Sequence, residues 1–205
     1  MHSREMHIEV QRCTEKDIPR VFEIVSLAFA NDHEFVDAIF PAHSSPEGRK
    51  LGSERMLATF HGDPYIASSS SGPVPPPPQL DGGYWKNKEE KRFAQALFHG
   101  FFAPRQQAIE ESGARLVALD MLMCDPDYQG QGAGRLLLKA GLSIADEMGV
   151  DAVVEGSDRD RRLYASEGFD GPHYVCSVPD EFAARRKQTY WWMRRSNTSV
   201  QKKLT

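Results

Sequence analysis

The stretch LVALDMLMCDPDYQGQGAGRLLLKAGLSIADEM, residues 116–148, decides the fold of this chain. An apolar, strand-like run over 116–124 leads through DPDY into the glycine-rich turn QGQGAG at 129–134, and a helical pattern follows directly over 135–148. Glycines let a backbone turn tightly and approach a ligand closely. The free N–H groups of a first helical turn, with the positive end of the helix dipole, attract phosphate oxygens. The order strand, glycine loop, helix therefore predicts an anion-binding site.

Two common phosphate-binding loops match this turn poorly. A nucleoside-triphosphate loop requires Lys and then Ser or Thr after its last glycine, whereas Arg135 and Leu136 stand there. A dinucleotide fingerprint requires a third glycine or alanine, and Arg135 occupies that place after Gly130 and Gly132. The first class is excluded and the second is disfavoured.

The spacing Gln129-x-x-Gly132-x-Gly134 resembles the pyrophosphate loop Q/R-x-x-G-x-G/A of the GNAT acetyltransferase superfamily, whose ligand is acetyl-coenzyme A (acetyl-CoA). The resemblance continues through the helix, a short strand DAVVEGS over 151–157, and DRDRRLYASEGF over 158–169, which is similar to the superfamily's LY…GF segment.

The resemblance implies an α/β fold of mixed α+β character, a single GNAT-like domain with a twisted mixed sheet flanked by helices. The sheet would split like a V between the strand that ends at Cys124 and the strand at Val153, and coenzyme A would lie in the split.

The bulk composition is that of a globular protein with 205 residues, 40% hydrophobic and 26% charged, which favours one domain. A net charge of −4 gives no electrostatic argument for a nucleic acid or an anionic membrane as partner. There is no apolar run of transmembrane length and no signal-peptide apolar region. The three cysteines, Cys13, Cys124 and Cys176, are odd in number and widely spaced, which disfavours a disulfide framework or a metal site. We expect a reduced, cytoplasmic protein without a metal.

Apolar periodicity and capping residues predict the remaining elements. The expected strands are 7–13, 151–155, 174–178 and 189–193, in addition to 116–124. The expected helices are 14–30, 34–40, 45–61, 87–111 and 158–167, in addition to 135–148. Thr14, Asn87 and Asp158 are the expected caps, the segment 179–187 looks helical, and Pro104 is expected to kink or split its helix.

The stretch 62–86 departs from the superfamily pattern, which has two paired strands there. It holds four consecutive serines and four consecutive prolines, and proline cannot donate to a strand ladder. We expect at most one short strand, at Tyr65 to Ala67, so that the sheet is reduced and has an exposed edge needing a partner from the loop or another subunit. The domain would span 1–195, with 62–86 as an irregular loop and 196–205 as a disordered tail.

The resemblance also implies which residues bind coenzyme A: the loop amides, and backbone groups of the preceding strand that face the pantetheine arm. The implied residues are Leu122, Met123, Cys124, Gln129, Gly130, Gln131, Gly132, Ala133, Gly134, Arg135 and Ser157. Phosphate contacts could also come from Lys139, Arg159, Arg161 and Arg162, all equally typical of plain surface charge.

Acetyl transfer to an amine requires loss of the amine proton, stabilisation of the oxyanion and protonation of the departing thiolate. Tyr164, in LYASEGF, matches the superfamily's thiol-protonating tyrosine, and a phenol with a pKa of about 10 is a suitable acid. Its alternative role is packing on Phe169.

The sequence offers several candidates for the base that accepts the amine proton. Asp120 interrupts the apolar strand, on the same face as Leu122 and Cys124. It either faces the cleft as base or water relay, or pairs with an arginine. Lesser candidates for the base are Glu155, His33 and Glu34. A nucleophilic pair of Cys124 with His173 lacks an orienting acid.

The resemblance to the GNAT superfamily implies an acetyl-CoA-dependent N-acetyltransferase, with acetyl-CoA as co-substrate. The acceptor would be a primary amine of a small molecule or peptide, attacking directly in a ternary complex, and the protein would be a monomer or homodimer with neither nucleic acid nor membrane as partner. The alternative from another class is a non-catalytic acyl-CoA-binding or interaction module on the same fold.

Overall fold

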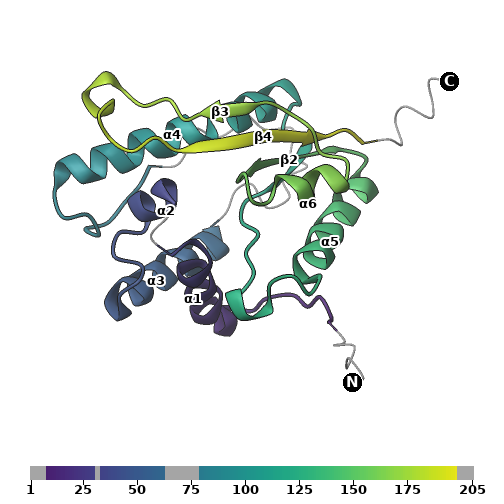
Figure 1. Cartoon of the computed structure of the whole chain (residues 1–205), viewed down its shortest axis with the longest axis horizontal. Coiled ribbons are helices and arrows are strands. Elements are labelled where there is room, and N and C mark those ends of the chain that lie inside the picture. Colours follow the sequence, from purple (N-terminus) through teal and green to yellow (C-terminus); the bar gives the residue numbers. More distant parts are fainter. Residues whose placement is uncertain (1–7, 31–32, 63–78, 198–205) are drawn as a thin grey trace.

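The computed structural model of the chain describes residues 8–30, 33–62 and 79–197 (Figure 1). The helices are α1 (Ile18–Phe29), α2 (Glu34–Ile39), α3 (Pro46–Gly62), α4 (Lys88–Glu111), α5 (Ala133–Met148) and α6 (Arg161–Ser166). The strands are β1 (Leu116–Leu119), β2 (Asp151–Gly156), β3 (His173–Val175) and β4 (Thr189–Arg195). The described residues also form three short 3-10 helices: Glu15–Asp17, directly before α1, and Pro126–Tyr128 and Asp180–Phe182, between later elements.

The four strands form one mixed sheet in the order β1-β2-β4-β3. β1 and β2 run parallel, joined through α5, and the register ends with Leu119 opposite Val154. β4 is antiparallel to both β2 and β3. This sheet, flanked by helices, confirms the predicted α/β class with a mixed sheet.

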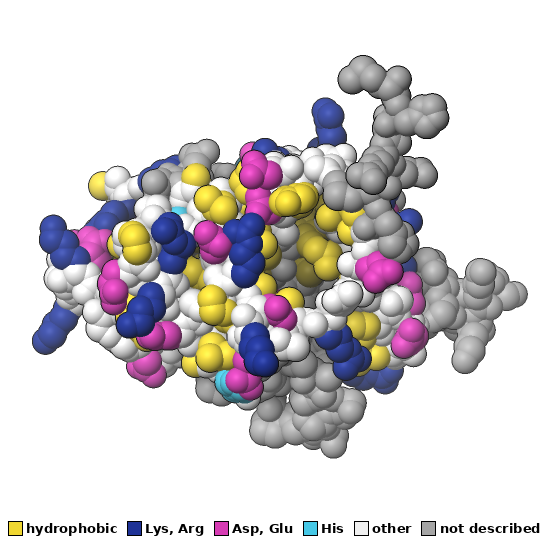
Figure 2. Space-filling model, turned by 90° about the horizontal axis from the view of Figure 1, so that it is seen from below, with side chains coloured by type: hydrophobic (Ala, Val, Ile, Leu, Met, Phe, Trp, Pro, Cys, Tyr) yellow, Lys and Arg dark blue, Asp and Glu magenta, His cyan; other side chains and the backbone are white. Residues whose placement is uncertain are grey.

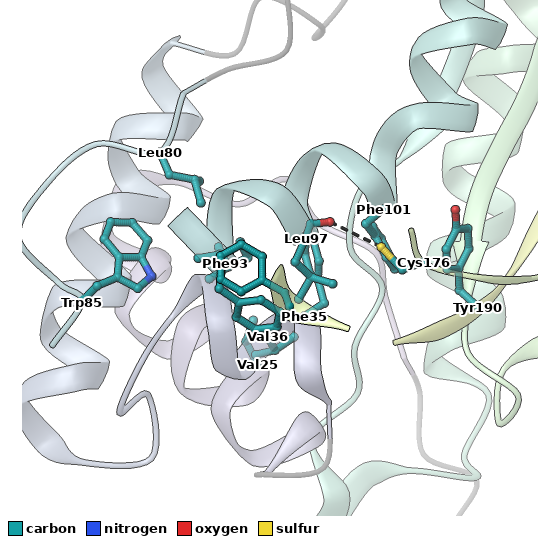
Figure 3. Packing of buried hydrophobic residues seen from close by; sticks show 13 residues of the cluster. Val25, Phe35, Val36, Leu80, Trp85, Phe93, Leu97, Phe101, Cys176 and Tyr190 are labelled. Atoms are coloured by element: carbon teal, nitrogen blue, oxygen red, sulfur yellow. Dashed lines mark hydrogen bonds between the residues drawn. The ribbon is translucent and has the colours of Figure 1, made fainter. Parts of the chain in front are cut away.

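Helices cover the sheet on both faces, because its residues alternate between two hydrophobic clusters. We define the α4 cluster as Val25, Phe35, Val36, Ile39, Leu80, Trp85, Phe93, Ala94, Leu97, Phe101, Cys176, Phe182 and Tyr190 (Figure 3). We define the α5 cluster as Leu138, Leu142, Ala145, Val150, Ala152, Val154, Tyr164, Phe169 and Met193. Tyr190 and Met193 of β4 belong to different clusters, so α4 with the N-terminal helices packs on one face, and α5 with α6 on the other.

Two of the three expected caps, Thr14 and Asn87, are confirmed, whereas Asp158 is not a cap, because Asp160 holds the N-cap position of α6. The Thr14 N–H donates to the Asp17 carboxylate at 2.8 Å, at the start of the 3-10 turn that leads into α1. The Glu90 N–H donates to the Asn87 side chain at 2.9 Å, at the start of α4. These bonds satisfy amides that have no partner inside the helix.

Several predicted boundaries are wrong. The described part of the predicted first strand, 8–13, is irregular: Val10 is 44% exposed, so the weak alternation has no apolar face to bury. β1 ends at Leu119 instead of Cys124, because the chain leaves the sheet there. α6 begins at Arg161, because the Ser157 hydroxyl accepts from the Asp160 N–H and holds the preceding residues in a turn.

Two further expectations also need correction. For Pro104 we expected a kink or a split; α4 is one helix through Pro104, so the split is wrong, and the kink stays a prediction. The segment 179–187, which looked helical, forms only one 3-10 turn, Asp180–Phe182.

The irregular stretch 62–86 lies largely outside the described residues. Its described part after 78 contains no strand, and the short strand expected at Tyr65 to Ala67 lies outside the described residues. Of the predicted tail, Asn197 is buried and its N–H donates to Asp151 at 2.8 Å, while 198–205 fall outside the described residues. No helix in the described ranges is both long and apolar enough to cross a membrane.

Candidate active site

The glycine loop ends in a helix whose first amides are unpaired. Gly130 and Gly132 have φ of +74° and +91°, a backbone region that side chains disfavour. Gly132 occupies the N-cap position of α5 and supplies no side chain to cap it. The amides of Ala133, Gly134 and Arg135 accordingly have no hydrogen-bond partner among the described residues. With the helix dipole, they form a site suited to phosphate oxygens.

Side-chain amides fix the loop in place. The Gln129 side chain donates to the Cys124 carbonyl at 3.2 Å and accepts from Arg159 at 3.0 Å. The Gln131 side chain donates to the Asp127 carbonyl at 3.3 Å. Gln129 therefore links the loop to the segment before it, and it holds one arginine beside the unpaired amides.

The segment that leads from β1 to the loop leaves its backbone open, except for the Cys124 carbonyl that Gln129 engages. Met121 and Met123 pack against the α4 cluster, and Leu122 packs against the α5 cluster. Within the described ranges, no hydrogen bond engages the amides of 121–124. These groups are therefore available to the amides of an extended ligand, as the resemblance implies for Leu122, Met123 and Cys124.

We call the place where the two parallel strands part, beyond Leu119 and Val154, the fork. Asp120 and Glu155 are the next residues of the two strands, and both carboxylates contact the guanidinium of Arg105 from α4. The start of α5 lies on the lower side of the molecule in Figure 1, and the view from below shows a hollow with hydrophobic side chains at its bottom (Figure 2).

Arg105 makes a dense set of contacts at the fork. Its Nε donates to Glu155 at 3.1 Å, its Nη2 to Glu155 and to the Leu119 carbonyl (3.1 Å), and its Nη1 to Asp120. Burial alone would lower the pKa of Arg105, but the two carboxylates outweigh this effect and raise it, so the guanidinium stays charged. For Asp120, the sequence left open a place in the cleft or a pairing with an arginine, and the structure shows the pairing, with Arg105.

Tyr164 lies on the opposite face of the sheet from Arg105. Its ring packs edge-on against Phe169 at 5.8 Å, and a Cβ on Gly156 would lie 2.9 Å from it, which makes glycine necessary there. Burial, and then the charges of Asp160 and Glu155, raise the pKa of Tyr164, so its hydroxyl remains protonated. That hydroxyl makes no hydrogen bond within the described part of the chain and is free to donate its proton.

Several other predicted site residues are engaged elsewhere. Arg135 pairs with Glu167 at 2.7 Å, and Ser157 donates to Asp160 at 2.7 Å. Arg161 lies over the Trp191 ring at 3.9 Å. The structure thus brings Arg159 to the loop, and it gives Arg135, Ser157 and Arg161 partners within the protein.

The lesser candidates for base or nucleophile lie in other surroundings. The His33 side chain accepts from the Val36 N–H at 3.4 Å and caps α2, of which Glu34 is the first residue. His173 faces Asp158 at 3.7 Å and packs against Trp191, so the structure shows no pairing of Cys124 with His173. Burial raises the pKa of the Cys124 thiol.

A separate cavity of about 270 Å³ lies between α4 and the connection from β3 to β4. Leu97 and Cys176 line it, together with Arg185 to Gln188. Phe101, which packs against Tyr190 at 4.7 Å, lies on α4 between Leu97 and Arg105 (Figure 3). Arg105 lies eight positions after Leu97 on α4, or about 12 Å along the axis, so this cavity is not part of the fork.

Sequence reasoning missed Arg105, although a signal was present. Arg105 continues the spacing of Phe93, Leu97 and Phe101, the apolar stripe of α4. A charged residue at a core position of one element, together with Asp120 at a core position of another, indicates a buried ion pair. As for metals, the described residues contain no group of three or more His, Cys, Asp or Glu side chains placed to hold an ion.

Comparison with known proteins agrees with this geometry. Residues 93–170 match the family model of the acetyltransferase (GNAT) domain. The matched part holds the loop, both strands of the fork, Arg105 and Tyr164. It confirms the resemblance to GNAT acetyltransferases, and acyl transfer is the chemistry that such a domain supports.

A solved structure described as "The crystal structure of acetyltransferase" is also similar, at 16% sequence identity and a TM-score of 0.44. The alignment covers 90% of this chain and 96% of that chain. A search of curated proteins found no match.

Proposed function

We propose that the protein is an N-acetyltransferase that moves the acetyl group of acetyl-CoA to a primary amine of a small molecule or peptide. The acceptor amine attacks directly while both substrates are bound. The observation that carries the proposal is the set of unpaired amides of Ala133 to Arg135, at the end of a segment that begins at the fork.

The residues at the loop fit the coenzyme. The three unpaired amides and Arg159 would hold the diphosphate, since neither glycine at the turn places a side chain in the way. The open backbone of 121–124 would bind the amides of the pantetheine arm. Bound acetyl-CoA supplies an activated acetyl group as a thioester.

Two side chains would carry out the two proton transfers of the reaction, one from the amine and one to the leaving sulfur. Asp120 pairs with Arg105 through one oxygen only, and its side chain is 59% exposed. Its other oxygen therefore accepts the proton that the amine loses as its nitrogen bonds to the acetyl carbon, directly or through water. Tyr164 gives its hydroxyl proton to the sulfur that leaves. Both groups lie close to the fork, on its opposite faces.

The coenzyme site is tested by adding a negative side chain to the loop. A Cβ on Gly134 would have only Leu163 nearby, at 3.7 Å, so Gly134→Glu should fold. Its carboxylate would repel the diphosphate, and we expect the thermal stabilisation by acetyl-CoA to disappear.

Gly141→Glu is the matched control, because Gly141 lies farther along α5 and its Cβ would meet no atom within 4 Å. This control should keep the full shift in melting temperature. Undiminished stabilisation of Gly134→Glu would rule out the proposed site.

Activity is tested by free-thiol release from acetyl-CoA in the presence of a panel of amines, peptides and aminoglycosides. We expect thiol release to depend on one class of amine, with acetylated product confirmed by mass spectrometry. Stabilisation by acetyl-CoA without release in the presence of any acceptor would instead support a non-catalytic acyl-CoA-binding module.

A further inference from the structure

Arg105 stands where the ladder between the two parallel strands would continue. The register ends at Leu119 and Val154, so Asp120 and Glu155 would form the next pair. Instead, the guanidinium lies against both carboxylates, and its Nη2 donates to the Leu119 carbonyl at 3.1 Å. The Arg105 side chain thereby takes the place of hydrogen bonds between β1 and β2 at the point where these strands part.

The two carboxylates around Arg105 differ in burial. The Glu155 side chain is 2% exposed and uses both oxygens on Arg105, forming a two-point pair. The Asp120 side chain is 59% exposed and uses one oxygen on Arg105, and its other oxygen makes no hydrogen bond to a described residue. Burial raises the pKa of Glu155, and the charge and hydrogen bonds of Arg105 oppose this effect. One cation thus faces two carboxyl groups, and the Asp120 carboxylate is the one open to solvent.

We propose that Arg105 is a positioning residue of the transfer: it fixes the Asp120 carboxylate at the mouth of the fork, and the buried Glu155 is the counterion that keeps the guanidinium there. This inference rests on the proposed function. The ring of Phe102, 4.6 Å from the guanidinium, closes one side of Arg105 and limits its movement. Asp120 then presents its free oxygen to the ammonium of the acceptor and accepts its proton.

A single Arg105→Met substitution would be a poor test, because it leaves Glu155 buried without its counterion, which commonly destabilises the fold strongly. The better variant replaces the pair together, Arg105→Met with Glu155→Gln. Exchanging a buried pair for neutral residues of similar size is often tolerated. This pair-replaced protein keeps the net charge of the wild type, because one cation and one anion are removed, so it changes the position of Asp120 and not the charge of the site.

The experiment compares four proteins: wild type, the pair-replaced protein, Asp120→Asn, and the variant with all three substitutions. Circular dichroism melting checks folding, calorimetry gives the Kd for acetyl-CoA, and thiol release gives kcat and KM for an active amine. We expect the pair-replaced protein to lose ten- to a hundredfold in kcat/KM for the amine, on the order of a small misplacement of a reacting group. Its Kd for acetyl-CoA should match the wild type, and the triple variant should be no worse than the poorer of its two parents.

The outcomes separate this inference from the proposed function. A folded pair-replaced protein with wild-type kcat/KM would overturn the role of Arg105, and so would a triple variant whose loss equals the product of the two separate losses. Wild-type protein that releases no thiol with any amine would overturn the proposed function, and with it the basis of the inference.

Discussion

Tyr164 has both a packing role, through its ring, and a proposed chemical role, through its hydroxyl. Its ring fills the place where Gly156 lacks a Cβ, while its hydroxyl has no hydrogen-bond partner within the described residues. Removing the oxygen should therefore disturb packing little. We predict that Tyr164→Phe lowers kcat on the order of a hundredfold, as expected for loss of a general acid, with an unchanged Kd for acetyl-CoA.

Steady-state thiol release and calorimetry measure the two quantities. Tyr174→Phe is the control, because Tyr174 is 40% exposed on β3 and should keep the wild-type kcat. A Tyr164→Phe protein with unchanged kcat would assign Tyr164 to packing alone.

At the scale of single residues, the spacing of glycines predicted the loop, but no spacing predicted which residues contact one another at the fork. Gly132 and Gly134 were identifiable because a strand, a glycine turn and a helix follow one another in the chain. Arg105 was overlooked: its place in the apolar stripe of α4 marked it as a buried charge, but the residues that it contacts depend on how α4 packs across the sheet. Asp120 was noticed as an ionisable residue in an apolar run, but the arginine that it contacts lies on another element.

Among the elements, α4 shows how packing overrides a local signal. Pro104 lacks the N–H that would donate to the Gly100 carbonyl, yet the helix continues. Phe101, Arg105 and Ala108, on both sides of Pro104, are buried against the rest of the molecule and keep the two halves in one helix. We predict that Pro104→Ala raises the free energy of unfolding by about 1–2 kcal/mol, because it restores a helical bond.

Urea denaturation measures the change. Pro19→Ala in α1 is the control: Pro19 lies in the first helical turn, where no N–H bond is lost. It should leave stability unchanged or lower it by about 0.4–1 kcal/mol, because the unfolded chain gains freedom. A Pro104→Ala protein no more stable than the wild type would show that the helix has adapted to proline.

The elements that could be predicted are those whose own sequence contains both their cap and their apolar face. Thr14 and Asn87 mark helix starts that the structure confirms. The expected strand over 8–13 failed because two apolar residues do not supply a face to bury, and a strand also requires a neighbour that no local pattern reveals. The end of β1 was misplaced for a related reason, since the apolar run continues to Cys124 while pairing ends at Leu119.

For the molecule as a whole, the sheet separates two buried tyrosines, one in each cluster. Tyr164 belongs to the α5 cluster and Tyr190 to the α4 cluster. Burial is the main cause that raises the pKa of both, and the charge of Glu155 adds to it in each case. The charged fork therefore influences both faces of the sheet.

These two tyrosines should make the protein sensitive to alkali. In the unfolded chain a tyrosine ionises at about pH 10, whereas in the folded protein both pKa values lie higher. Above about pH 10 the folded state binds more protons than the unfolded state, so the free energy of unfolding falls as pH rises, by up to about 1.4 kcal/mol per pH unit for each tyrosine. Cys176, whose pKa burial raises to about 11, adds a change of the same sign. The test measures urea midpoints from about pH 8 to about pH 11 for the wild type and for the double variant Tyr164→Phe with Tyr190→Phe. The midpoint of the double variant should decline less steeply with pH, since Cys176 is present in both proteins. Equal slopes would contradict the burial of the two hydroxyls.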